Sequence, residues 1–72
     1  MDQDRIDKLV AAFRLGLLEG FKRPEVMFSG VADDSGLTFG DKVLHEVFDS
    51  GVNIGQVEAS GRELLDWKSN GG

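Results

Sequence analysis

The chain contains no cysteine and no tyrosine, and it has one histidine, one proline and one tryptophan among its 72 residues. Without cysteine it can form no disulfide, no thiolate zinc site and no cysteine nucleophile. A cysteine-free composition fits a reducing compartment, so we expect a cytoplasmic protein. A domain this short buries only about 60% of its unfolded surface and therefore needs a well-packed core or a partner chain.

Basic side chains are also scarce. The sequence has 13 acidic and 8 basic residues, which gives a formal net charge of -5. From residue 25 onward, nine acidic residues stand against three basic ones, Lys42, Arg62 and Lys68. Nonspecific binding to nucleic acid or to anionic lipid requires clusters of lysine and arginine. We therefore expect neither of these partners, and we expect a protein partner with a basic surface instead.

Long hydrophobic runs are missing as well. The longest apolar run, residues 9–18, contains Arg14, and it is far shorter than the roughly 20 apolar residues that a membrane-spanning helix needs. The first residues are acidic, so we expect no signal peptide. An apolar fraction of 40% with five phenylalanines is sufficient for folding. We expect one domain over residues 1–70 and a frayed tail over residues 70–72.

The most apolar stretch, residues 9–21, lies in a segment whose spacing predicts a first helix over residues 3–19, capped by Asp2 or Asp4. The stripe expected to face the core consists of Ile6, Leu9, Val10, Phe13 and Leu17. Leu15 and Leu18 project to nearly the opposite side of this helix. A second apolar face requires a cover, either from the rest of the chain or from a partner. The expected interaction residues are Leu15, Leu18, Ala11, Arg14 and Trp67.

The sequence contains ten glycines, and several of them bear on where the predicted helices end or approach one another. Gly20 followed by Pro24 predicts the end of the first helix. Gly16 lies inside that helix, which predicts close approach of another backbone there, with Gly61 as the suggested counterpart. Three glycine pairs have the GxxxG spacing, and in a chain without a membrane span we interpret them as helix stops and turns. These pairs are Gly16 and Gly20, Gly36 and Gly40, and Gly51 and Gly55.

Residues 25–39 allow two interpretations. The turn signal at residues 33–36 lies between two short apolar stretches, which predicts a small β-hairpin. The alternation of apolar and polar residues is imperfect, because residues 26–28 are all apolar. The alternative is an irregular loop that places Phe28 and Phe39 in the core.

Two more helices are expected after this segment. Residues 41–50 form the second, capped by Thr38 or Asp41 and ended by Gly51, and residues 54–69 form the third. The predicted fold is therefore a mainly α, small three-helix domain with a hairpin or structured loop at residues 25–39.

Residues 41–67 also resemble a helix-turn-helix, with residues 50–52 as the turn. Asn53 and Gln56 would then lie near the start of a recognition helix, and both are good readers of adenine. The weakness of this alternative is charge, because only Arg62 and Lys68 on that helix could contact phosphates.

His45, with Asp41 and Asp49 one turn to either side, forms a row of potential metal ligands on one helix face. So few ligands on a solvated face bind a metal weakly, so weak surface metal binding is a second alternative. We assign no metal, cofactor or catalytic residue.

The function that these features favour is non-enzymatic. We expect a small acidic protein–protein interaction module, a regulatory or inhibitory adaptor that forms a homodimer through its first helix. Burying Leu15 and Leu18 at roughly 1.5 to 3 kcal/mol each would matter to so small a domain. A short acidic chain of this composition suits a bacterial or phage protein.

Overall fold

The computed structural model describes the backbone of residues 2–69 and the side chains of residues 2–61. Its elements are α1 (Gln3–Lys22), the 3-10 turn η1 (Phe28–Gly30), α2 (Val31–Asp34) and α3 (Lys42–Ser69). No strand occurs within residues 2–69, so the mainly helical class is confirmed and the hairpin is absent. The predicted tail at residues 70–72 lies outside the described residues.

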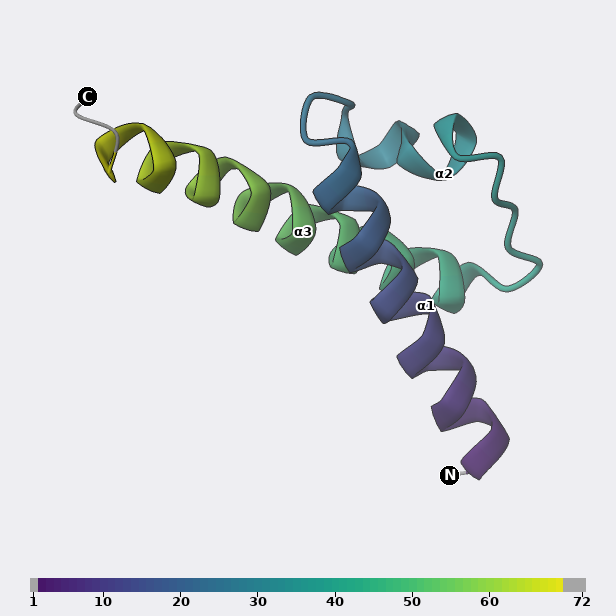
Figure 1. Ribbon diagram of the computed structural model, residues 1–72. Helices are drawn as coiled ribbons and strands as arrows, with labels where there is room; N and C mark the ends of the chain where they lie inside the picture. The colour runs from purple at the N-terminus through teal and green to yellow at the C-terminus, as the bar shows by residue number, and fades with distance from the viewer. Residues whose placement is uncertain (1, 70–72) are drawn as a thin grey trace.

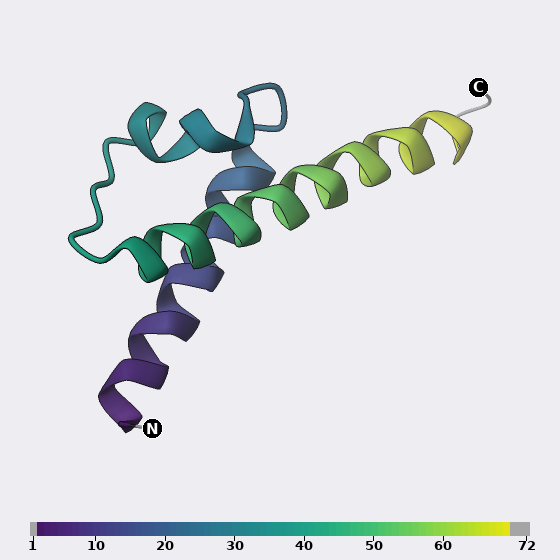
Figure 2. The same cartoon turned by 180° about the vertical axis from the view of Figure 1, so that it is seen from behind.

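The C-terminal half of α1 crosses the N-terminal half of α3, and the two helices form the frame of the molecule (Figure 1). At Gly51 an added Cβ would meet the carbonyl oxygen of Phe13, and at Gly55 it would meet that of Leu17. From Gly51 to Gly55 is one turn forward along α3, and their contacts, Phe13 and Leu17, are one turn forward along α1. The two helices therefore run in the same direction. A parallel pair requires the chain to travel back along α1, and residues 23–41 make this return (Figure 2).

The crossing is a contact between backbones, and it is reciprocal. A Cβ at Gly16 would overlap the carbonyl oxygen of Phe48 and lie 3.1 Å from the Cα of Gly51. A Cβ at Gly20 would overlap the carbonyl oxygen of Val52 and lie 2.8 Å from its Cα. Real Cβ atoms do not approach backbone so closely, so only glycine fits at these positions. The carbonyl oxygens take the place of the missing Cβ atoms, where they can accept weak hydrogen bonds from glycine Cα–H groups.

This packing corrects several predictions about glycine. Gly20 does not end α1, which continues to Lys22 just before Pro24, and Gly51 does not end a helix either. The two helices expected at 41–50 and 54–69 form the single helix α3. These glycines can lie inside helices because they make room for a neighbouring backbone. The contact between the two backbones offsets their low helix propensity. The predicted approach at Gly16 is confirmed, but the counterpart is Gly51, since an added Cβ at Gly61 meets nothing within 4 Å.

The buried side of α1 is therefore a row of small residues, Ala12, Gly16 and Gly20. The stripe that the sequence predicted to face the core is wrong in part, because Ile6 and Val10 are exposed. The remaining members of that stripe, Leu9, Phe13 and Leu17, are half-buried at its edge. The large apolar side chains of α1 therefore lie beside the crossing and not within it.

The return segment, residues 23–41, covers one side of the helix pair. Val31 and Ala32 are buried against Phe48 and Val52 of α3, and Phe39 packs against Phe48 in a tilted arrangement with ring centroids 5.1 Å apart. Neither interpretation of residues 25–39 is right in full, because residues 28–34 form η1 and α2. Phe39 packs against the core as the loop interpretation predicted, but Phe28 remains exposed and Val31 takes the core position.

The turn signal at residues 33–36 ends a helix. The backbone N–H of Leu37 donates to the carbonyl of Ala32 at 2.8 Å, and that of Gly36 donates to Asp33 at 3.1 Å. With Gly36 at φ +75°, this is a Schellman motif, which requires a residue in the left-handed region after the helix. The glycine-containing turn predicted here is real, and it closes α2 instead of joining two strands.

The glycine contact predicts opposite effects for two chemically identical substitutions in α3. Gly51→Ala should lower the free energy of unfolding by about 2 kcal/mol or more, because its Cβ would overlap the carbonyl of Phe13. Gly61→Ala meets open space and should raise that free energy by about 0.5 to 1 kcal/mol through helix propensity. Urea unfolding followed by circular dichroism at one fixed protein concentration measures both values. Equal effects of the two substitutions would contradict the interdigitated crossing.

Candidate functional site

The two sides of the helix pair differ in how they are covered. Leu15 and Leu17 are two residues apart in α1 and so project about 200° apart, to opposite sides. Leu15 packs against the core beneath the return segment. Leu17 lies on the other side, where no part of residues 2–61 covers the pair to the same extent. We call this side the open face and define it by Val10, Leu17, Phe21, Ile54 and Glu58, with Leu18 at its border.

The large apolar side chains of the open face are exposed. The exposed fractions are 44% for Val10, 58% for Leu18, 42% for Phe21 and 47% for Ile54. Single exposed apolar residues are ordinary, but a contiguous group across two helices is typical of an interaction site.

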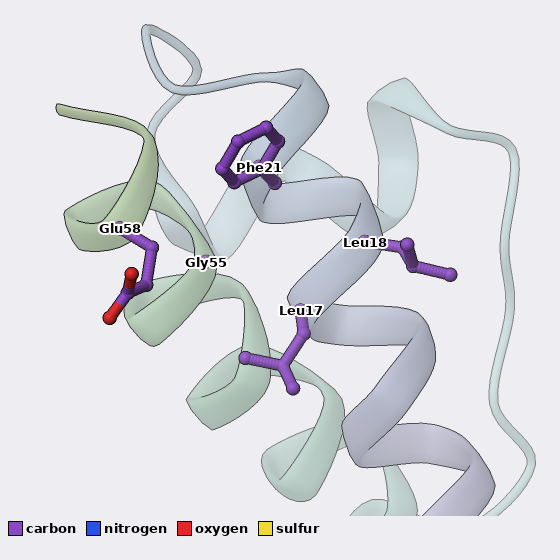
Figure 3. Close-up of a pocket in the computed structure, with 5 residues that line it drawn as sticks. All are labelled: Leu17, Leu18, Phe21, Gly55 and Glu58. Carbon is purple, nitrogen blue, oxygen red and sulfur yellow. The ribbon is translucent and has the colours of Figure 1, made fainter. Parts of the chain in front are cut away.

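A shallow pocket of about 250 Å³ lies within the open face. It is lined by Leu17, Leu18 and Phe21 from α1 and by Gly55 and Glu58 from α3. Leu17 and Phe21 extend toward α3, whereas Leu18 projects away from it (Figure 3). Gly55 lines the pocket at the point where it also allows the backbones of α1 and α3 to approach each other.

The predicted interaction residues separate into three groups. Leu15 is half-buried by the chain itself, so it is not a free contact residue. Leu18, Ala11 and Arg14 are exposed, and Leu18 borders the pocket. The side chain of Trp67 lies outside the described residues. Sequence reasoning missed Ile54, Gly55 and Glu58, although the matching GxxxG spacings at 16–20 and 51–55 were the signal that could have found them.

Two opposite charges border the open face. Arg14 lies one turn before Leu18 on α1, and Glu58 lines the pocket from α3. Both side chains are exposed, and neither forms an ion pair within residues 2–61. By contrast, Glu19 pairs with Arg23, which also pairs with Asp34 at 2.7 Å on the covered side.

A separate charge pair ties the first turns of the two helices. The guanidinium of Arg5 donates to the carboxylate of Asp41, which also accepts from the backbone N–H of Val43 at 2.8 Å. Asp41 is thus the predicted cap of the helix that begins at Lys42. The hydrogen bond from Arg5, followed by that from Val43, lowers the pKa of the Asp41 carboxyl. The same pair raises the pKa of Arg5.

The turn predicted between two helices at residues 50–52 is wrong, because these residues lie inside α3. The side chain of Gln56, predicted to contact a base, forms hydrogen bonds within the chain instead. Its side-chain amide donates to the carbonyl oxygens of Arg23, at 3.0 Å, and Val26. It therefore fastens the start of the return segment to α3, and the helix-turn-helix geometry is absent.

His45 belongs to the packing of the return segment. Its ring stacks on Phe39 with centroids 5.7 Å apart, and its Nε2 lies 3.5 Å from Asp49 Oδ2. The third member of the predicted row, Asp41, is engaged by Arg5. Within the described residues, no three histidine, aspartate or glutamate side chains gather closely enough to hold a metal ion.

Comparison with known proteins gives no function: no family model, no curated protein and no solved structure matches the chain. Among the described residues, no helix combines the length and the hydropathy that crossing a bilayer requires.

The Arg5–Asp41 pair predicts a pH-dependent stability. Because the pKa of Asp41 is lower in the folded than in the unfolded chain, its contribution is present above about pH 4 and is lost as the pH falls through the folded-state pKa. Asp41→Asn keeps a capping side chain and should lower the melting temperature at pH 7, with a smaller difference at pH 2.5.

Asp33→Asn is the matched control, since the Asp33 side chain is exposed and makes no ion pair within residues 2–61. It should change the melting temperature little at either pH. An Asp41→Asn deficit that is as large at pH 2.5 as at pH 7 would contradict the charge pairing.

Proposed function

We propose that this chain is a non-enzymatic protein–protein interaction module that binds through the open face. The observation that carries the proposal is the asymmetry of the helix pair, in which one side is covered by residues 23–41 and the other leaves Leu18, Phe21 and Ile54 exposed beside a pocket. Contiguous apolar surface with polar residues at its edge is what protein interfaces present.

The small core supports the same proposal. Only Phe48, Val31 and Val52 are large, fully buried side chains within the described residues. A partner on the open face would bury further apolar area at about 25 cal/mol per Å² and would stabilise the folded chain. We further propose a cytoplasmic location, on the cysteine-free composition. A regulatory or inhibitory role and a bacterial or phage origin stay predictions.

Site-specific photocrosslinking in cells that produce the protein tests this proposal. A photoreactive amino acid at Leu18 or at Ile54 should give protein adducts several-fold more strongly than one at Asp33, which is exposed on the covered side. The expected pattern reflects which face meets a partner, because all three positions are accessible. Adducts from none of these positions, or equal adducts from both sides, would overturn the proposal.

A further inference from the structure

We infer that the open face is occupied by a second copy of this chain in a two-fold symmetric dimer. In this dimer Leu18 of each copy enters the pocket of the other, and Arg14 of each copy pairs with the other copy's Glu58. The inference rests on the proposed function, since it names the partner of the same face.

The exposed area of the chain is the first argument. The accessible surface is 5139 Å², whereas a folded monomer of 7.8 kDa is expected to expose about 4,400 Å². The chain therefore exposes about 700 Å² more than a compact monomer of this mass would. The end of α3 extends past α1 (Figure 2).

The shape of the molecule agrees with this argument. Its radius of gyration is 14.1 Å and its dimensions are 50 × 24 × 13 Å. A compact chain of this length would have a radius of gyration of about 11 Å. The chain is therefore elongated and thin, and a second copy on the open face would cover apolar side chains that residues 23–41 leave exposed.

The need for a permanent partner favours a second copy. A partner stabilises the folded state of a chain with so small a core only while that partner is bound. Another copy is present wherever the chain is made. A two-fold interface also requires only that one surface be complementary to itself.

The open face has this self-complementarity. Leu18 projects outward at the border of the pocket, so a knob and a hollow lie next to each other (Figure 3). Arg14 lies on α1 one turn before the knob, and Glu58 lies on α3 at the pocket. A two-fold axis between Arg14 and Glu58 brings opposite charges together twice. The net charge of -5 on each copy opposes association, but salt screens this repulsion beyond about 8 to 10 Å.

Charge reversal with sedimentation equilibrium across the micromolar range tests the inference. Wild-type protein should dimerise reversibly. Arg14→Glu and Glu58→Arg should each raise the dissociation constant by about tenfold or more, because two attractive pairs become repulsive. The double variant should return to within about threefold of wild type, since it restores both pairs.

Mixing the two single variants gives a sharper result. In a heterodimer of Arg14→Glu with Glu58→Arg, both cross-pairs regain opposite charges, so the mixture should associate although each variant alone does so weakly. The matched controls Lys42→Glu and Glu25→Arg change the net charge by the same amounts at exposed positions outside the open face. They should leave the dissociation constant within about twofold of wild type.

A monomeric wild type, or a dimer that neither reversal weakens, would overturn the inference. The inference would also be overturned if each single variant lost affinity and neither the double variant nor the mixture regained it. If the purified chain is monomeric but the Leu18 and Ile54 positions still give adducts in cells, the interaction module stands and its partner is a different protein. If neither association nor face-specific adducts are found, both proposals fail.

Discussion

The contact between the backbones of α1 and α3 determines the rest of this structure. Gly16 and Gly51 face each other because each removes the Cβ that would otherwise meet a carbonyl oxygen of the opposite helix. The register of this contact makes the helices parallel, and a parallel pair can be joined only by a long return segment. Residues 23–41 are that segment, and they cover the side along which they travel. The covered side and the open face are thus both consequences of four glycines.

A crossing made of backbone buries few large side chains. The apolar residues of the two amphipathic helices therefore lie beside the contact, where one set meets the return segment and the other set faces outward. Polar contacts hold the arrangement at its ends: Arg5 with Asp41 at the first turns, and Gln56 with the carbonyls of Arg23 and Val26 where the return segment begins. Because the crossing buries few large side chains, apolar surface remains exposed on the open face. This exposed apolar surface is the reason for the proposed interaction.

The sequence predicted the features that depend on local order. Apolar spacing located the helical segments, and short acidic side chains located caps at Asp2 and Asp41, since both effects act within one or two turns. The role of each glycine could not be predicted locally, because a stop, a hinge and a close approach use the same residue. The sequence indicated that Leu15 and Leu18 both need a cover; Leu18 is exposed, and the cover over Leu15 depends on the path of residues 23–41. That path follows from the parallel crossing, a contact between residues far apart in the sequence.

The central claim is that α1 and α3 of one chain touch through Gly16 and Gly51, and nuclear Overhauser spectroscopy tests it most directly. The two Cα atoms are close enough that a Cβ built at Gly16 lies 3.1 Å from the Cα of Gly51. The account predicts a cross-peak between the Hα protons of these glycines that persists in a sample of labelled chains diluted with unlabelled ones. Loss of this cross-peak on dilution, or its absence in assigned spectra of the folded protein, would contradict the account.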